Sequence, residues 1–165
     1  MTNINLIGKQ FPSLNLPPTE LRLCRGDNHI KVYDRLRKKY VTLTPEEYVR
    51  QHFVDWLIKY KNYPSSIVSN EVSIVLNGTK KRCDTIIFMT DGSPLMIVEY
   101  KAPDIEISQC VFDQIVRYNM TLKARFLAVS NGINHYCCEI DYVNGSYRFM
   151  RDIPTYNEIK NISIK

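Results

Sequence analysis

The pattern of apolar and polar positions divides this chain into segments that predict a mixed α/β protein. Apolar side chains recur at helical spacing at Val49, Phe53, Trp56, Leu57 and Tyr60, and again within residues 107–122 at Val111, Ile115, Tyr118 and Leu122. Shorter apolar segments predict strands at residues 20–24, 30–34, 71–76, 126–130, 135–142 and 146–150, together with two runs that flank Asp91-Gly92. From residue 45 the predicted order is therefore helix, three strands, helix and strand, followed by a terminal hairpin. Residues 1–19 predict an irregular arm, and the tail after residue 150 shows no clear pattern.

The first helix has a well-marked start. Thr44 is a good N-cap, the proline after it suits the first turn, and Glu47 completes a capping box with Thr44. Glu46 lies three residues before Val49, so we expect it at the N-terminal edge of the buried face. Glu47 should then point about 100° away from Glu46 around the helix.

The hairpin around Asp91-Gly92 gathers charged residues. If Asp91 and Gly92 are the two loop residues, Asp84 lies directly opposite Glu99, and Lys101 shares the face of Glu99. Directly opposed like charges destabilise a sheet, and a hard divalent cation bound between them is the simplest reason to keep them.

A solvated, exposed face is the alternative for these carboxylates. The near-continuous apolar runs in both strands instead indicate a sheet covered on both faces. An unpaired charge in such a sheet is costly, which favours a metal site.

Composition sets wide bounds on function. The 165 residues, 44% of them hydrophobic and 24% charged, suit one domain spanning residues 1–165. A net charge of +5 permits a polyanionic partner without requiring one. No apolar run is long enough to span a bilayer, and the N-terminus lacks the pattern of a signal peptide. Five cysteines without a Cys-x-x-Cys pair argue against a zinc site and favour reduced thiols, so we expect a cytoplasmic protein without membrane contact.

The charged residues carry a family resemblance. Asp84 followed by Glu99-Tyr100-Lys101, after a helix that bears two glutamates, resembles the PD-(D/E)xK nuclease superfamily, with Cys83-Asp84 where Pro-Asp gives the family its name. The predicted order of helix, three strands, helix and strand is also the core of that superfamily.

Two further features sharpen the resemblance. Gln114 and Tyr118 look like the Gln-xxx-Tyr element of the RecB-like branch. The segments 37–51, 98–103 and 113–119 look like the N-terminal nuclease domain of type I restriction enzyme R subunits, and the resemblance runs from about residue 30 to 155.

This resemblance implies a restriction-endonuclease-like α/β fold, with a mixed central sheet flanked by helices and an N-terminal β-hairpin extension. It implies an endonuclease that hydrolyses DNA phosphodiester bonds with Mg²⁺, for which Mn²⁺ can substitute. The implied catalytic residues are Asp84, Glu99, Lys101, Glu46 and Gln114, of which Asp84, Glu99 and Glu46 would bind the metal ion. Glu47 is the alternative to Glu46 as the helix carboxylate of the site.

Several of these residues also have simpler explanations. Lys101 could be a salt-bridge partner of the two carboxylates, and Glu46 could be a first-turn acid that complements the helix dipole. The expected nucleic-acid-binding residues are Arg37, Lys38, Lys39, Lys81, Arg82 and Tyr118. The basic run could instead be a solvated loop, and Tyr118 could belong to the core.

One departure from the R subunits bears on function. The sequence contains no Gly-x-x-x-x-Gly-Lys-Ser/Thr phosphate loop, so we expect no ATP-driven translocation within this polypeptide. The chain could be a free-standing nuclease, or it could act with helicase or specificity subunits. The alternative is a catalytically silent nucleic-acid-binding or assembly domain of a restriction or defence system.

Overall fold

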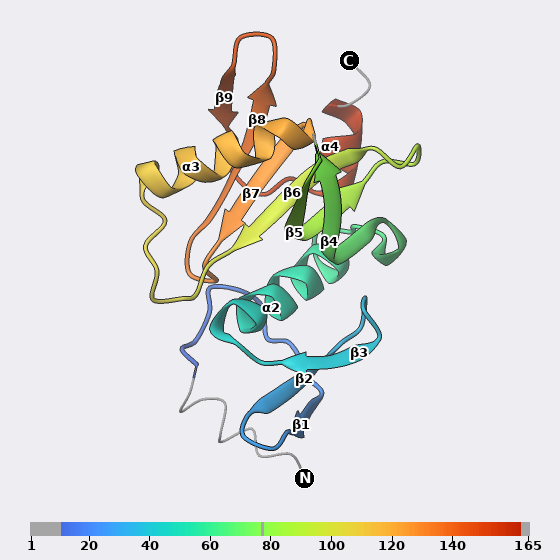
Figure 1. The fold of residues 1–165 in the computed structure, drawn as a ribbon, viewed down its shortest axis with the longest axis vertical. Helices are drawn as coiled ribbons and strands as arrows, with labels where there is room; N and C mark the ends of the chain where they lie inside the picture. Colours follow the sequence, from blue (N-terminus) through green and yellow to red (C-terminus); the bar gives the residue numbers. More distant parts are fainter. Residues whose placement is uncertain (1–10, 77, 163–165) are drawn as a thin grey trace.

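The computed structural model describes residues 11–76 and 78–162, which form two sheets and the helices that cover them (Figure 1). The three-stranded sheet contains β1 (Leu23–Arg25), β2 (Ile30–Asp34) and β3 (Lys39–Thr42). The six-stranded sheet contains β4 (Val68–Leu76), β5 (Thr79–Phe88), β6 (Pro94–Tyr100), β7 (Phe126–Ser130), β8 (His135–Asp141) and β9 (Ser146–Phe149). The α-helices are α2 (Pro45–Lys59), α3 (Gln109–Asn119) and α4 (Tyr156–Ile162), with 3₁₀ turns at Ser65–Ile67 and Met120–Leu122.

The six strands lie side by side in sequence order. Strands β4, β5 and β6 form an antiparallel meander, β7 pairs parallel to β6, and β8 and β9 return antiparallel. The parallel step requires a crossover connection, and α3 supplies it. The predicted mixed sheet and the order helix, three strands, helix, strand are therefore confirmed.

Both faces of the large sheet are covered, as the continuous apolar runs predicted. Met96 and Val98 of β6 pack in one core with Val49, Phe53 and Leu57 of α2. The intervening Ile97 packs in a second core with Phe112, Ile115 and Val116 of α3. Successive side chains of a strand alternate between faces, so β6 buries residues against both helices.

The β5–β6 hairpin has the predicted register in its body but a different tip. Thr85 pairs with Val98 and Ile87 with Met96, as a two-residue Asp91-Gly92 loop would require. The register then shifts at a bulge, and Phe88 pairs with Pro94. Residues 89–93 form the tip, which is closed by the Met89 N–H bonded to the Ser93 carbonyl oxygen at 2.8 Å. The predicted two-residue loop is thus wrong, while the pairing that it implied deeper in the sheet holds.

The predicted N-terminal hairpin is confirmed, because β1 pairs antiparallel with β2, and β3 extends it to a three-stranded sheet. The basic run that was expected to be a loop forms a turn and then continues into β3, where Tyr40 pairs with Tyr33 of β2. Figure 1 shows α2 lying between this sheet and the larger one. The tail, which gave no sequence prediction, contains α4, and its Ile159 is fully buried. No helix in the described part of the chain is long and apolar enough to cross a membrane.

Candidate active site

Asp84 and Glu99 are neighbours on adjacent strands. Thr85 of β5 pairs with Val98 of β6, and Asp84 and Glu99 are the adjacent residues of these two strands. The two carboxyl groups share a hydrogen bond. The backbone N–H of Tyr100 donates to Oδ2 of Asp84 at 2.9 Å, which fixes one oxygen of that carboxylate. The hairpin therefore brings the two carboxylates together, as the spacing predicted.

The crowding of these carboxylates has an electrostatic consequence. Burial, the charge of Asp84 and the shared hydrogen bond raise the pKa of Glu99 from 4.5 to about 8. The charge of Lys101 and a hydrogen bond to Asn119 partly offset this rise. The metal-free pair of carboxyl groups therefore holds a shared proton at neutral pH.

Lys101 follows directly after the last residue of β6. Its backbone N–H donates to the carbonyl oxygen of Ser130 at 2.9 Å, so the β6–β7 pairing extends to this residue. Its side chain is half-buried, and its charge acts on Glu99. Asp84, Glu99 and Lys101 thus belong to one cluster.

The helix glutamates are arranged opposite to expectation. Glu46 is exposed, whereas Glu47 is buried at 6% exposure. The N–H of Glu47 donates to Oγ1 of Thr44, which confirms the N-cap. The Glu47 carboxylate accepts from Arg37 at 2.7 Å and from Arg50 at 2.8 Å instead of closing a capping box. Glu46 therefore does not join the carboxylate cluster.

Arg50 of α2 connects this helix to the site. Its Nη1 donates to Glu47, while its Nη2 lies 3.0 Å from Oδ1 of Asp84 and 2.7 Å from Oε1 of Glu71. The side chain is only 4% exposed. Burial lowers the pKa of Arg50, but the charges of Glu47, Asp84 and its other neighbours raise it on balance. Arg50 is therefore a buried cation shared by three carboxylates.

Sequence reasoning missed Arg50, Glu71 and Asn119. The pairs Asn70–Thr85 and Val72–Cys83 flank Glu71, which places Glu71 opposite Asp84 on the other side of β5. The sequence contained a signal for this placement, because a two-residue turn at Asn77-Gly78 requires Glu71 to lie opposite Asp84. Asn77 itself lies outside the described residues.

Buried polar contacts form a closed ring behind the cluster. Tyr100 donates to Thr85, Thr85 to Asn70 at 2.7 Å, and Asn70 to Asp34 at 2.9 Å. Arg37 joins Asp34 to Glu47 by ion pairs. Arg50 then closes the ring, since its Cζ lies 5.6 Å from the centroid of the Tyr100 ring. These contacts tie α2, β2 and the β5–β6 hairpin together.

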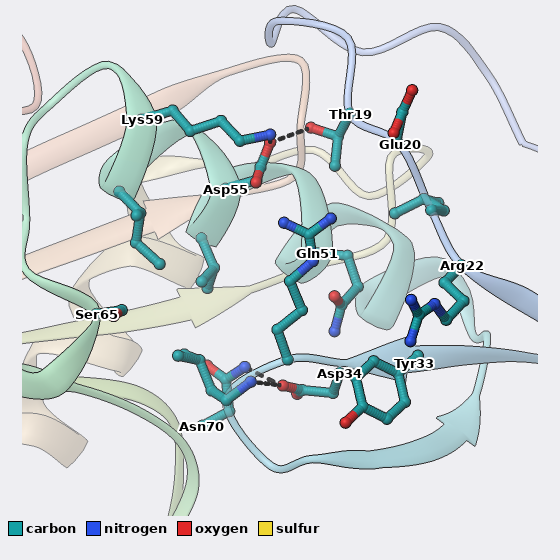
Figure 2. A pocket seen from close by; sticks show the side chains of 15 residues that line it. Thr19, Glu20, Arg22, Tyr33, Asp34, Gln51, Asp55, Lys59, Ser65 and Asn70 are labelled. Carbon is teal, nitrogen blue, oxygen red and sulfur yellow. Dashed lines mark hydrogen bonds and ion pairs between the residues drawn. The ribbon is translucent and has the colours of Figure 1, made fainter.

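A pocket of about 300 Å³ adjoins this ring on the side of the three-stranded sheet. Figure 2 shows Asn70 and Asp34 meeting in its wall, with Thr19 and Asp55 joined across it. Burial raises the pKa of Asp34, but hydrogen bonds from Arg37 and Asn70 outweigh burial and leave it lowered. None of the residues lining this pocket belongs to the carboxylate cluster.

The second helix contributes a different residue from the one predicted. Gln114 is exposed, whereas Asn119 is buried at 1% exposure and bonds to Glu99. The buried face of α3 contains Phe112, Ile115 and Asn119, so Gln114 lies away from it. Tyr118 is within α3, but its side chain is outside the described part of the structure.

The expected DNA-contacting residues fall into two groups. Arg37 is bound to Asp34 and Glu47 with only 15% of its side chain exposed, so it is not free to bind a phosphate. Lys38 and Lys39 are exposed. Arg82 pairs with Glu71 at 2.7 Å yet keeps 71% of its side chain exposed. The side chain of Lys81 is not described.

The donors present fit a hard divalent cation with few protein ligands. Among the residues described, no group of three or more histidine, cysteine, aspartate or glutamate side chains could hold a metal ion. Two adjoining carboxylates nevertheless suit Mg²⁺, which keeps several waters and commonly binds through one or two carboxylates. The raised pKa of Glu99 marks the place where a cation would relieve repulsion.

Comparison with known proteins identifies the family. The sequence profile described as "Type I restriction enzyme R protein N terminus" matches residues 45–154, which is most of the chain. The chain therefore belongs to this family of type I restriction enzyme R protein N-terminal domains.

A solved structure supports the fold. The chain resembles a fragment of a protein assigned as an HsdR subunit of a type I restriction enzyme from Vibrio vulnificus YJ016, with a TM-score of 0.51 and 22% sequence identity. The match covers 72% of this chain and 25% of that one, so the matched region spans about a quarter of the Vibrio fragment. A search of curated proteins gave no significant match.

Proposed function

We propose that this chain is a Mg²⁺-dependent endonuclease domain of a type I restriction system that hydrolyses DNA phosphodiester bonds. The observation that carries the proposal is the cluster of Asp84, Glu99 and Lys101, in which two carboxylates and an ammonium meet at one end of a covered sheet. The family match supplies the context of restriction and of partner subunits. The chain is expected to work in the cytoplasm with DNA and with helicase or specificity subunits, and Mn²⁺ should replace Mg²⁺.

Each residue of the cluster has a distinct role in this proposal. Asp84 and Glu99 hold the ion, which when bound supplies positive charge to the scissile phosphate and lowers the pKa of a water. Glu99 must release its proton on binding, because its pKa lies near 8 in the metal-free protein. Lys101 places an ammonium beside the carboxylates, where it stabilises the negative charge that develops on phosphate oxygens.

A catalytically silent assembly domain is the second candidate function. It is favoured by the absence, among the described residues, of a third carboxylate, histidine or cysteine that could complete a metal site. It is also favoured by Arg50, which already neutralises part of the charge on Asp84.

Plasmid cleavage separates the two candidates. Supercoiled plasmid is incubated with the protein and millimolar Mg²⁺ or Mn²⁺, beside an Asp84→Ala variant and an Asp104→Ala control in the exposed loop after the site. The proposed function predicts nicking by the wild type and by Asp104→Ala, and none by Asp84→Ala. Equal amounts of nicked plasmid with all three proteins would show that a contaminating nuclease causes the nicking. No nicked plasmid under any metal condition would favour the silent domain.

A further inference from the structure

We infer that Arg50 is the positioning residue of this site: its guanidinium, anchored by Glu47 and Glu71, fixes the carboxylate of Asp84 in the orientation that binds the metal ion. The inference rests on the proposed function, because it assigns Arg50 a role toward the ion that Asp84 would hold. It extends the site from the β5–β6 hairpin to α2 and β4.

Arg50 helps to fix the orientation of the Asp84 carboxylate. Nη2 of Arg50 contacts Oδ1 of Asp84 at 3.0 Å, and the Tyr100 N–H contacts Oδ2 at 2.9 Å. Each oxygen therefore has one donor besides the hydrogen bond that Asp84 shares with the Glu99 carboxyl group, and together these two donors fix the plane of the carboxylate. Once the shared proton leaves on metal binding, each oxygen has a second lone pair that can bind a cation.

The positive charge of Arg50 has partners besides Asp84. Glu47 and Glu71 contact Arg50 at 2.8 Å and 2.7 Å, so its positive charge is balanced by carboxylates other than Asp84. A cation balanced in this way orients Asp84 while neutralising only part of its charge. Asp84 thereby keeps the negative charge that a metal ligand needs.

Glu71 of β4 in turn holds Arg50 in place. Glu71 sits between two paired residues of β4 with φ of +56°, a left-handed conformation that is unfavourable for a residue other than glycine. Its carboxylate bonds both Arg50 and Arg82 at 2.7 Å. Such strain costs on the order of 1–3 kcal/mol and persists where surrounding contacts impose it. Here the strained backbone aims Glu71 at Arg50.

Stability alone is a weak explanation for this arrangement. Burying an ion cluster is often no more favourable than packing hydrophobic side chains of the same volume. Arg50 also leaves its Nε buried without a hydrogen-bond partner in the described structure, which adds a desolvation cost. A purely structural position would favour an apolar side chain, whereas a residue that orients Asp84 needs the guanidinium fork.

The test is metal binding by an Arg50→Lys variant. Lysine keeps the charge but lacks the planar fork that spans Glu47 and Asp84 together. Isothermal titration of Mn²⁺ into the full chain should show affinity weakened by about 10- to 100-fold, the usual effect of losing a partner that orients a metal ligand. Plasmid nicking should then require correspondingly more Mn²⁺ and recover at high metal concentration.

Arg37→Lys is the matched control, because Arg37 also pairs with Glu47 but does not contact Asp84. Its Mn²⁺ affinity should match the wild type. If Arg50→Lys fails to fold, as judged by circular dichroism, Glu71→Gln replaces it and should show a smaller weakening.

Three results would overturn the inference. One is a folded Arg50→Lys, or in its place Glu71→Gln, that binds Mn²⁺ as the wild type does. Another is equal weakening in Arg37→Lys and Arg50→Lys. The third is a wild type that binds no Mn²⁺ at all, and this result alone would also remove the proposed function.

Discussion

Replacing Glu99 with glutamine should stabilise the metal-free protein at alkaline pH. Glutamine keeps the shape of the protonated glutamic acid and can donate a hydrogen bond to Asp84. It cannot acquire the second negative charge that the wild type places beside Asp84 when Glu99 ionises. The variant therefore removes one titration from the folded state and leaves the packing in place.

The size of the effect follows from the pKa of Glu99. Its pKa rises from 4.5 to about 8 on folding, so the folded state retains a proton that the unfolded chain has lost. The resulting stabilisation is fully present below about pH 4.5 and is lost as the pH rises through about 8. At ~1.4 kcal/mol per unit of pKa difference, the wild type should lose on the order of 4–5 kcal/mol across this window relative to the variant.

Urea denaturation with a metal chelator present measures this difference. The free energies of unfolding of wild type and Glu99→Gln are compared at several values between about pH 5 and pH 9, where the linkage acts. Glu106→Gln, at an exposed position, serves as the control and should follow the wild type. If the wild-type and Glu99→Gln profiles ran parallel throughout this range, the reasoning about a crowded carboxylate pair would be refuted.

Three further predictions concern the metal, Lys101 and the basic run. Millimolar Mg²⁺ should raise the melting temperature of the wild type but not of Asp84→Asn, because the ion stabilises only a native state that binds it; equal shifts in a thermal melt would contradict this. Lys101→Ala should abolish nicking while DNA affinity by fluorescence anisotropy stays near wild type, since the lysine acts on the transition state; a matching loss of affinity would make it a binding residue. Replacing Lys38 and Lys39 with glutamine should weaken binding to DNA of any sequence and flatten the salt dependence of that binding by about one unit of slope per lost phosphate contact. Arg37→Ala should instead lower the free energy of unfolding by about 3–5 kcal/mol, because it leaves buried carboxylates without their partner. Unchanged salt dependence in the lysine variant, or unchanged stability in Arg37→Ala, would contradict these separate roles.

The carboxylate pair could be predicted from sequence because local rules determine it. A turn signal and strict alternation along two strands place Asp84 against Glu99, and the body of the hairpin keeps that register despite a longer tip. The same rules applied to the turn at residues 77–78 would also have identified Glu71. Patterns of this kind survive because one face of each strand must be buried.

The helical contributions depended on small rotations that the sequence left open. The buried face of α3 contains the predicted Ile115 together with Phe112 and Asn119, whereas Gln114 is exposed, so the amide that bonds to Glu99 comes from a different position. The pattern of apolar residues locates the buried face but does not decide which polar residue of the helix reaches the site, since several positions have suitable spacing.

Contacts between distant elements lay beyond sequence reasoning altogether. In the sequence, nothing distinguishes Arg50 from the other charged residues of an amphipathic helix. Its role depends on contacts with Glu71 and Asp84, which lie on two different strands. Strand β3 was likewise hidden by the basic residues at its start, because charge runs are typical of solvated loops.

The central claim is that Asp84 and Glu99 together bind a divalent metal ion. A crystal of the wild-type protein soaked in Mn²⁺, with anomalous data collected near the manganese edge, tests it most directly. The account predicts an anomalous peak bound by carboxylate oxygens of both residues, and the loss of that peak in Asp84→Asn crystals. A map with no peak between these two side chains, in crystals that bind Mn²⁺ elsewhere, would contradict the claim.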